Sequence, residues 1–263
     1  MTAGTFLQLE LEPPPALKLG DASIAAAFTA KSASVSSCVD IVRQGRCTLV
    51  TTTQMFKILA LNCLVSAYGL SVLHLRGVRI GDTQATATGL STAATFLFLS
   101  FSRPLPKLSP KRPPSSVLAP AVLSSVLGQF GVHLYVLISA VSLAEAHSRG
   151  PPPEVDAEFE PTLPNTIVWH ISSAMLLVTF AVNYKGRPFM EPLSANKWLM
   201  ATLVLSAAVL AALMTGAAPD LEDYLELVPL DSEVLRSDLG SLVALDLAAC
   251  WGVEKLMSLL SGF

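Results

Sequence analysis

Six long apolar stretches separated by polar loops limit this chain to one kind of fold. A helix needs about 20 mainly apolar residues to cross the hydrocarbon core of a bilayer, and the six stretches cover residues 53–75, 83–101, 117–144, 164–183, 198–218 and 239–260. Charged residues form only 14% of the 263 residues, against roughly 25% in soluble domains. We therefore predict an all-α membrane protein, in which a six-transmembrane-helix bundle follows a short cytosolic stalk segment of residues 1–52.

The loops between these stretches alternate in charge. The loops after the second and fourth stretches contain four and three basic residues, against none and one acidic residue. The loops after the third and fifth contain five and seven acidic residues, with one arginine each. Because basic loops favour the cytosolic side, we expect both chain termini and the two basic loops to be cytosolic. Arg76 and Arg79, in a very short loop, are the exception.

The first 52 residues are too polar to span a membrane. Within them, residues 32–43 are predicted to form a short amphipathic helix that Gly45 interrupts. From Cys47 the chain is predicted to continue as one helix into the first apolar stretch, like a stalk. A freestanding domain of this size is marginal, so we expect the segment to be the end of something larger.

Motifs of a self-contained enzyme are absent from the sequence. The four cysteines form no CxxC pair, which excludes the usual zinc and redox motifs. The chain has no nucleophile elbow, phosphate-binding loop or HExxH motif. A net charge of −3 gives no reason to expect a nucleic-acid partner. We therefore predict no catalytic residue, no bound cofactor and no metal ligand in this chain.

Several short segments, in order along the chain, resemble the type V, subgroup A, P-type ATPases. The most specific is TFAVNYKGRPFME at residues 179–191. The others are KLGDASIAA at 18–26, QGRCTLV at 44–50, QMFKILALN at 54–62, SRPL at 102–105, KRP at 111–113 and FEPTL at 159–163. The segment at residues 18–26 looks like the end of the family's phosphorylation domain. The resemblance extends from about Lys18 to the end of the chain.

The resemblance implies a location, a role and a set of partners. The family consists of endoplasmic-reticulum membrane pumps that use ATP to remove misinserted transmembrane helices. The six apolar stretches would be the pump's membrane helices five to ten. The implied partners are membrane lipid, the N-terminal half of the ATPase and a transmembrane-helix substrate.

The catalytic motifs of that family are absent here. The chain has no Asp-Lys-Thr-Gly-Thr motif, and it lacks the magnesium-binding and Thr-Gly-Glu loops. Phosphoryl transfer requires a nucleophile, metal ligands and a phosphate cradle. We therefore expect that this chain alone cannot hydrolyse ATP, that ATP and Mg²⁺ belong to the complete enzyme, and that the chain is a fragment or a separately encoded half. The alternative is a non-enzymatic six-span scaffold or assembly factor.

Polar residues within the apolar stretches are the candidate site residues, because buried polar groups are costly in a membrane. By resemblance, the substrate pocket involves the second stretch. The candidates for the substrate pathway are Asn62, Gln84, Thr88, Thr92 and Asp246. For Asn62 and Asp246 the alternative is a bond to a neighbouring helix. The candidates for polar contacts between helices are Gln129, His133 and His170. Glu254 and Lys255 are predicted to reach the membrane interface.

Overall fold

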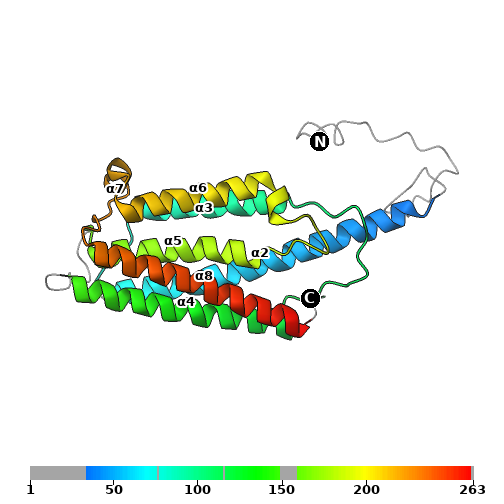
Figure 1. Ribbon diagram of the computed structural model, residues 1–263, viewed down its shortest axis with the longest axis horizontal. Helices are drawn as coiled ribbons and strands as arrows, with labels where there is room; N and C mark the ends of the chain where they lie inside the picture. Colours follow the sequence, from blue (N-terminus) through cyan, green and yellow to red (C-terminus); the bar gives the residue numbers. More distant parts are fainter. Residues whose placement is uncertain (1–33, 76, 115, 149–158, 262–263) are drawn as a thin grey trace. The chain divides into compact units, whose positions relative to one another are not determined.

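The computed structural model describes residues 34–75, 77–114, 116–148 and 159–261 (Figure 1). It divides into two compact units, Met1–Val42 and Arg43–Phe263. Of the first unit, only residues 34–42 are described, and they contain the start of a helix. The predicted similarity at residues 18–26 lies outside the described residues.

Helices form nearly all of the regular structure in the described residues, and no strand occurs there apart from one isolated bridge. The six long helices are α2 (Ser36–His74), α3 (Asp82–Ser100), α4 (Pro120–His147), α5 (Leu163–Asn183), α6 (Lys197–Thr215) and α8 (Glu233–Ser261). Two short ones are the 3₁₀ helix η1 (Leu193–Ala195) and α7 (Pro219–Tyr224). The protein is therefore an all-α membrane protein, as its sequence predicts.

Local chemistry fixes several helix ends. Thr162 accepts a hydrogen bond from the backbone of Asn165 at the start of α5. Asn196 does the same for Leu199 at the start of α6. Both are good N-cap residues, because their side-chain oxygens satisfy N–H groups that the first turn leaves unpaired. α6 ends at Gly216, whose φ of 74° is the left-handed conformation that glycine adopts freely.

α2 is longer than predicted. It continues from Ser36 through Gly45 to His74, so the predicted interruption at Gly45 is wrong. Glycine in a helix interior costs only about 1 kcal/mol relative to alanine. The residues that flank Gly45 hold the helix in place from outside. The Arg46 guanidinium donates to the carbonyls of Ser109 and Lys111, and Cys47 and Val50 pack against Met190.

Four of the described helices are long and apolar enough to cross a membrane: α2, α4, α5 and α6. α3 is polar because of its threonines and Gln84, and α8 contains Asp246, Glu254 and Lys255. α8 nevertheless packs against α4 and α5, and α3 packs against α5 and α6 (Figure 1). Large apolar side chains such as Leu205 and Trp251 point out of the bundle, which is the pattern expected on a lipid-facing surface.

The main core joins four helices. Val65 and Leu73 of α2 are buried with Leu137 of α4, Ile171 of α5 and Leu239 of α8. A second apolar cluster joins α2, α3, α5 and α6. The helices therefore form one bundle within the unit that begins at Arg43.

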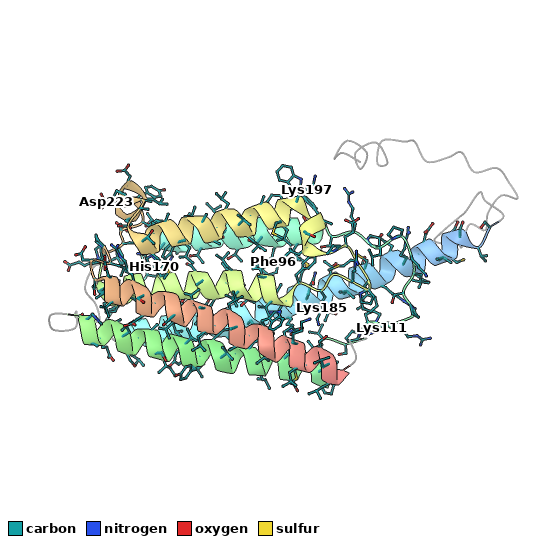
Figure 2. All side chains as sticks on the ribbon, viewed as in Figure 1. Phe96, Lys111, His170, Lys185, Lys197 and Asp223 are labelled. Atoms are coloured by element: carbon teal, nitrogen blue, oxygen red, sulfur yellow. The ribbon has the colours of Figure 1, made fainter. Side chains whose placement is uncertain are left out.

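The two ends of this bundle carry opposite charge. At one end, which we call the basic end, the loops 101–119 and 184–196 meet through the Pro104–Met190 bridge and backbone bonds beside it. At the other, the acidic end, the residues 77–81, 159–162 and 216–232 lie together, with Gly81 close to Phe159 and Glu226. Lys111, Lys185 and Lys197 lie toward the first end and Asp223 at the second (Figure 2).

Candidate functional site

Buried polar side chains form three clusters at different levels of the bundle. The first surrounds Glu254 of α8, nearest the basic end. Its carboxylate pairs with Lys57 of α2 and, at 2.9 Å, with Lys185 of the loop after α5. Ser125 of α4 donates to it at 2.5 Å and Gln129 at 3.1 Å. A buried carboxylate is tolerated only with such partners, so this cluster ties three helices and a loop together.

Gln129 extends the first cluster to α5. Its amide exchanges two hydrogen bonds with that of Asn183: Gln129 Nε2 donates at 3.0 Å and Asn183 Nδ2 donates back at 2.8 Å. Both side chains are fully buried or nearly so. Gln129 therefore connects α4 with α5 and α8. Beside the cluster, Gln54 of α2 accepts a hydrogen bond from the backbone N–H of Lys185 at 2.8 Å.

The second cluster lies deeper in the bundle, around His133 of α4. Its Nδ1 lies 2.8 Å from Oδ1 of Asp246 on α8, and its Nε2 lies 3.3 Å from Oγ1 of Thr179 on α5. The Cys250 thiol is 3.8 to 3.9 Å from the same ring. All four side chains are buried. Within the described residues, Oδ2 of Asp246 has no hydrogen-bond partner.

The third cluster lies at the acidic end, around the fully buried Gln84 of α3. Its amide donates to Oδ1 of Asn165 on α5 at 2.9 Å and to the carbonyl of Leu225 at 3.1 Å. Thr88 donates to the Gln84 carbonyl at 2.9 Å and accepts from the Trp169 indole at 3.2 Å. These bonds fasten the first turns of α3 to α5 and to the loop after α7.

The remaining candidates lie outside the three clusters. Thr92 is half-buried and donates to the Thr88 carbonyl within α3. Asn62 is half-buried on α2, and its amide nitrogen has no partner among the described residues. His170 donates from Nδ1 to the Thr166 carbonyl of its own helix at 2.8 Å. The structure thus brings His133 together with Asp246, whereas Asn62 and His170 lie outside the three polar clusters.

Sequence reasoning missed several members of these clusters. Glu254, predicted to reach the interface, is only 8% exposed. Lys255 beside it is exposed and lies over the Trp251 ring. Lys57, Lys185 and Asn183 were not predicted at all, although a lysine inside the first apolar stretch is a signal that a buried acidic partner exists.

The basic end has a further polar side chain, half-buried, just outside the membrane helices. The Tyr184 hydroxyl donates to the Glu191 carbonyl at 3.0 Å. Burial raises the pKa of this phenol above its ordinary value. Tyr184 therefore stays a neutral donor that braces the loop between α5 and α6.

Comparison with known proteins shows that this chain is similar in sequence to part of several much longer ATPases and translocases. No family model matches the chain. The chain is 47% identical over 243 residues to the "Probable manganese-transporting ATPase PDR2" of Arabidopsis thaliana. The aligned region covers 92% of this chain and 20% of that protein. It is 46% identical over 245 residues to the "Endoplasmic reticulum transmembrane helix translocase" of Schizosaccharomyces pombe. The aligned region again covers 92% of this chain and 20% of the relative. It is 31% identical over 202 residues to the human "Polyamine-transporting ATPase 13A2", covering 75% of this chain and 17% of that one. The chain thus spans about a fifth of the length of the first two relatives.

Proposed function

Since the chain is homologous to part of the type V, subgroup A, P-type ATPases, we propose that it forms the membrane transport domain of an ATP-driven translocase of transmembrane helices. The observation that carries this proposal is its 46% identity to a transmembrane helix translocase over 92% of the chain. ATP and Mg²⁺ would be bound elsewhere in the complete enzyme, because this chain has no phosphorylated aspartate or phosphate-binding loop.

The coupling element in this proposal is α2, which continues into the bundle from residues outside the predicted membrane stretch. Lys57 ties it to α8, and Gln54 ties it to the Lys185 backbone. A displacement of the first turns of α2 would therefore move the loop after α5 and the end of α8. The partner that drives it would be the N-terminal half of the ATPase, in the same or a separate chain.

The substrate in this proposal is a transmembrane helix, and its pathway follows the polar side of α3. Thr88 and Thr92 are half-buried there, and Asn62 of α2 offers an unpaired amide donor. Such groups would hydrogen-bond the polar flanks of a helix leaving the bilayer, where unpaired polar groups are costly. Gln84 and Asp246, predicted for the same pathway, are fully buried with partners of their own. We therefore assign these two to holding helices together.

For orientation and location, we propose that all six long helices cross the endoplasmic-reticulum membrane, with the basic end and both termini in the cytosol. The basic residues of loops 101–119 and 184–196 support this orientation through the positive-inside rule. Three of the similar proteins have the endoplasmic reticulum in their names. Membrane lipid is then the solvent of the apolar outer surface.

The decisive experiment restores the missing catalytic part. The chain is co-expressed with the matching N-terminal part of a related translocase, and removal of a fluorescent, mistargeted transmembrane helix from sealed vesicles is followed with and without ATP. We expect ATP-dependent removal, and none when the phosphorylated aspartate of the added part is changed to asparagine. Removal that is equal with and without ATP would overturn the proposal and favour the scaffold interpretation.

A further inference from the structure

We propose that His133, Asp246 and Cys250 form a binding site for a zinc ion between α4 and α8. Their potential ligand atoms all lie within 4.8 Å of one another, and all three side chains are buried. The two helices that carry them lie side by side along the bundle (Figure 1). No known zinc motif signals this site in the sequence, because the histidine lies 113 residues from the aspartate.

The spacing of the three side chains suits one metal ion. Asp246 and Cys250 are four residues apart on α8, so they project from the same face one turn apart. The sulfur of Cys250 lies 3.9 Å from Nδ1 and 3.8 Å from Nε2 of His133, so it faces the ring, and the imidazole must turn for Nδ1 and the sulfur to bind one ion. Tetrahedral zinc with its usual bond lengths separates its ligand atoms by roughly 3.3 to 3.8 Å. The Nδ1–Oδ1 distance of 2.8 Å must widen by about half an ångström for zinc to enter.

Charge favours zinc in this environment. A carboxylate inside a membrane bundle is costly unless it is paired, and Oδ2 of Asp246 has no hydrogen-bond partner in the described part of the chain. Zinc bound by one carboxylate, one thiolate and one neutral imidazole forms an uncharged unit. The ion would thus supply the missing partner without adding net charge to the apolar interior.

Thr179 of α5 helps to orient the His133 ring for metal binding. Its hydroxyl lies 3.3 Å from Nε2 of His133 and can accept the proton of that nitrogen. The lone pair of Nδ1, which faces Asp246, is then available to a metal. A hydrogen bond to the second ring nitrogen is the usual way in which proteins orient a metal-binding histidine.

The ligand set selects the metal. A thiolate, an imidazole and a carboxylate are typical of zinc, whereas manganese and magnesium prefer oxygen ligands alone. The zinc would cross-link α4 to α8 beneath the Glu254 cluster. It would be separate from the substrate pathway proposed along α3, so its presence can be tested independently of transport.

The test measures bound metal rather than activity. The chain, in its longest natural form, is purified in detergent, loaded with Zn²⁺, freed of excess by gel filtration and analysed by mass spectrometry of its metal content. We expect about one zinc per chain, because the three side chains together offer ligands for a single ion. His133→Ala, Asp246→Asn and Cys250→Ser should each weaken zinc binding at least about tenfold, and Thr179→Val roughly tenfold, because the hydroxyl that accepts from Nε2 of His133 is lost.

The matched controls change a cysteine and a histidine outside the cluster. Cys63→Ser, on an exposed position of α2, and His170→Ala should bind zinc like the parent chain. Cobalt provides a second measurement on the unmodified protein, because a thiolate ligand gives Co²⁺ a charge-transfer absorption band. Folded parent chain without bound zinc and without that band would overturn the proposal, and so would zinc binding that the three ligand variants leave unchanged. Equal competition by Mn²⁺ would overturn the choice of zinc.

Discussion

The Lys57–Glu254 pair allows the sharpest test of how this bundle is held together. Lys57 and Glu254 are 7% and 8% exposed, and they come from the first and last long helices of the described chain. Removing one partner of a buried ion pair typically costs about 3–5 kcal/mol, because the other charge is left buried and unpaired. The structure predicts that the two possible removals differ in cost.

Lys57→Met leaves Glu254 with Lys185 at 2.9 Å and with the donors Ser125 and Gln129. We therefore expect a loss near the lower limit, about 3 kcal/mol. Glu254→Gln removes the carboxylate from two ammonium groups at once, so we expect about 5 kcal/mol. At about 2–4 °C per kcal/mol for a protein of this size, the expected decreases in Tm are roughly 6–12 °C and 10–20 °C.

The assay is thermal unfolding in detergent, followed by fluorescence-detected gel filtration. The double variant Lys57→Met, Glu254→Gln should lose less than the sum of the single losses by about 1–3 kcal/mol, as expected for contacting residues. Lys255→Met is the matched control, since this lysine is exposed one position further along, and should change stability by less than about 0.5 kcal/mol. Additive losses, or a Lys57→Met variant as stable as the control, would refute the reasoning.

Two further predictions test the packing and the orientation of the bundle. A Cβ at Gly128 would lie 2.9 Å from Cγ1 of Val253 on α8, so Gly128→Ala should lower the free energy of unfolding by about 1–3 kcal/mol. Gly131→Ala adds its methyl group to open space on the same helix and should be neutral or stabilise by up to about 1 kcal/mol. The same thermal assay measures both variants, and equal effects would contradict the close approach of α4 and α8. The orientation is tested by single cysteines in a background without the native cysteines. A cysteine at Lys107 should react with an impermeant maleimide only from the cytosolic face of sealed microsomes, and one at Asp231 only from the lumenal face. The reverse pattern would invert the proposed topology.

Hydropathy predicts the helices well because the preference for a membrane is a property of local sequence. The predicted stretch 164–183 and the helix α5, Leu163–Asn183, differ by one residue. The continuity of α2 was missed because Gly45 is a weak helix former and the contacts that offset it come from loops far along the chain. A single-residue propensity of about 1 kcal/mol decides little against such contacts.

The polar clusters were only half predictable, for a different reason. An Asp, His or Gln within an apolar stretch is costly unless it has a polar partner. The sequence therefore predicts that Gln129, His133 and Asp246 each have such a partner. Which partner it finds depends on how helices are arranged around one another. Lys57 and Glu254 are 197 residues apart, and no local pattern indicates that they meet.

The positions of these contacts indicate where force can enter the bundle. Side-chain hydrogen bonds and an ion pair join α2 to other elements at positions from Arg43 to Lys57, at the basic end. Beyond Lys57, α2 packs through apolar residues such as Val65 and Leu73. Separating the Lys57–Glu254 pair would leave a buried charge unpaired, at a cost of about 3–5 kcal/mol. We therefore expect a displacement of α2 to act first on α8 and on the loop at Lys185, which these polar contacts join to it.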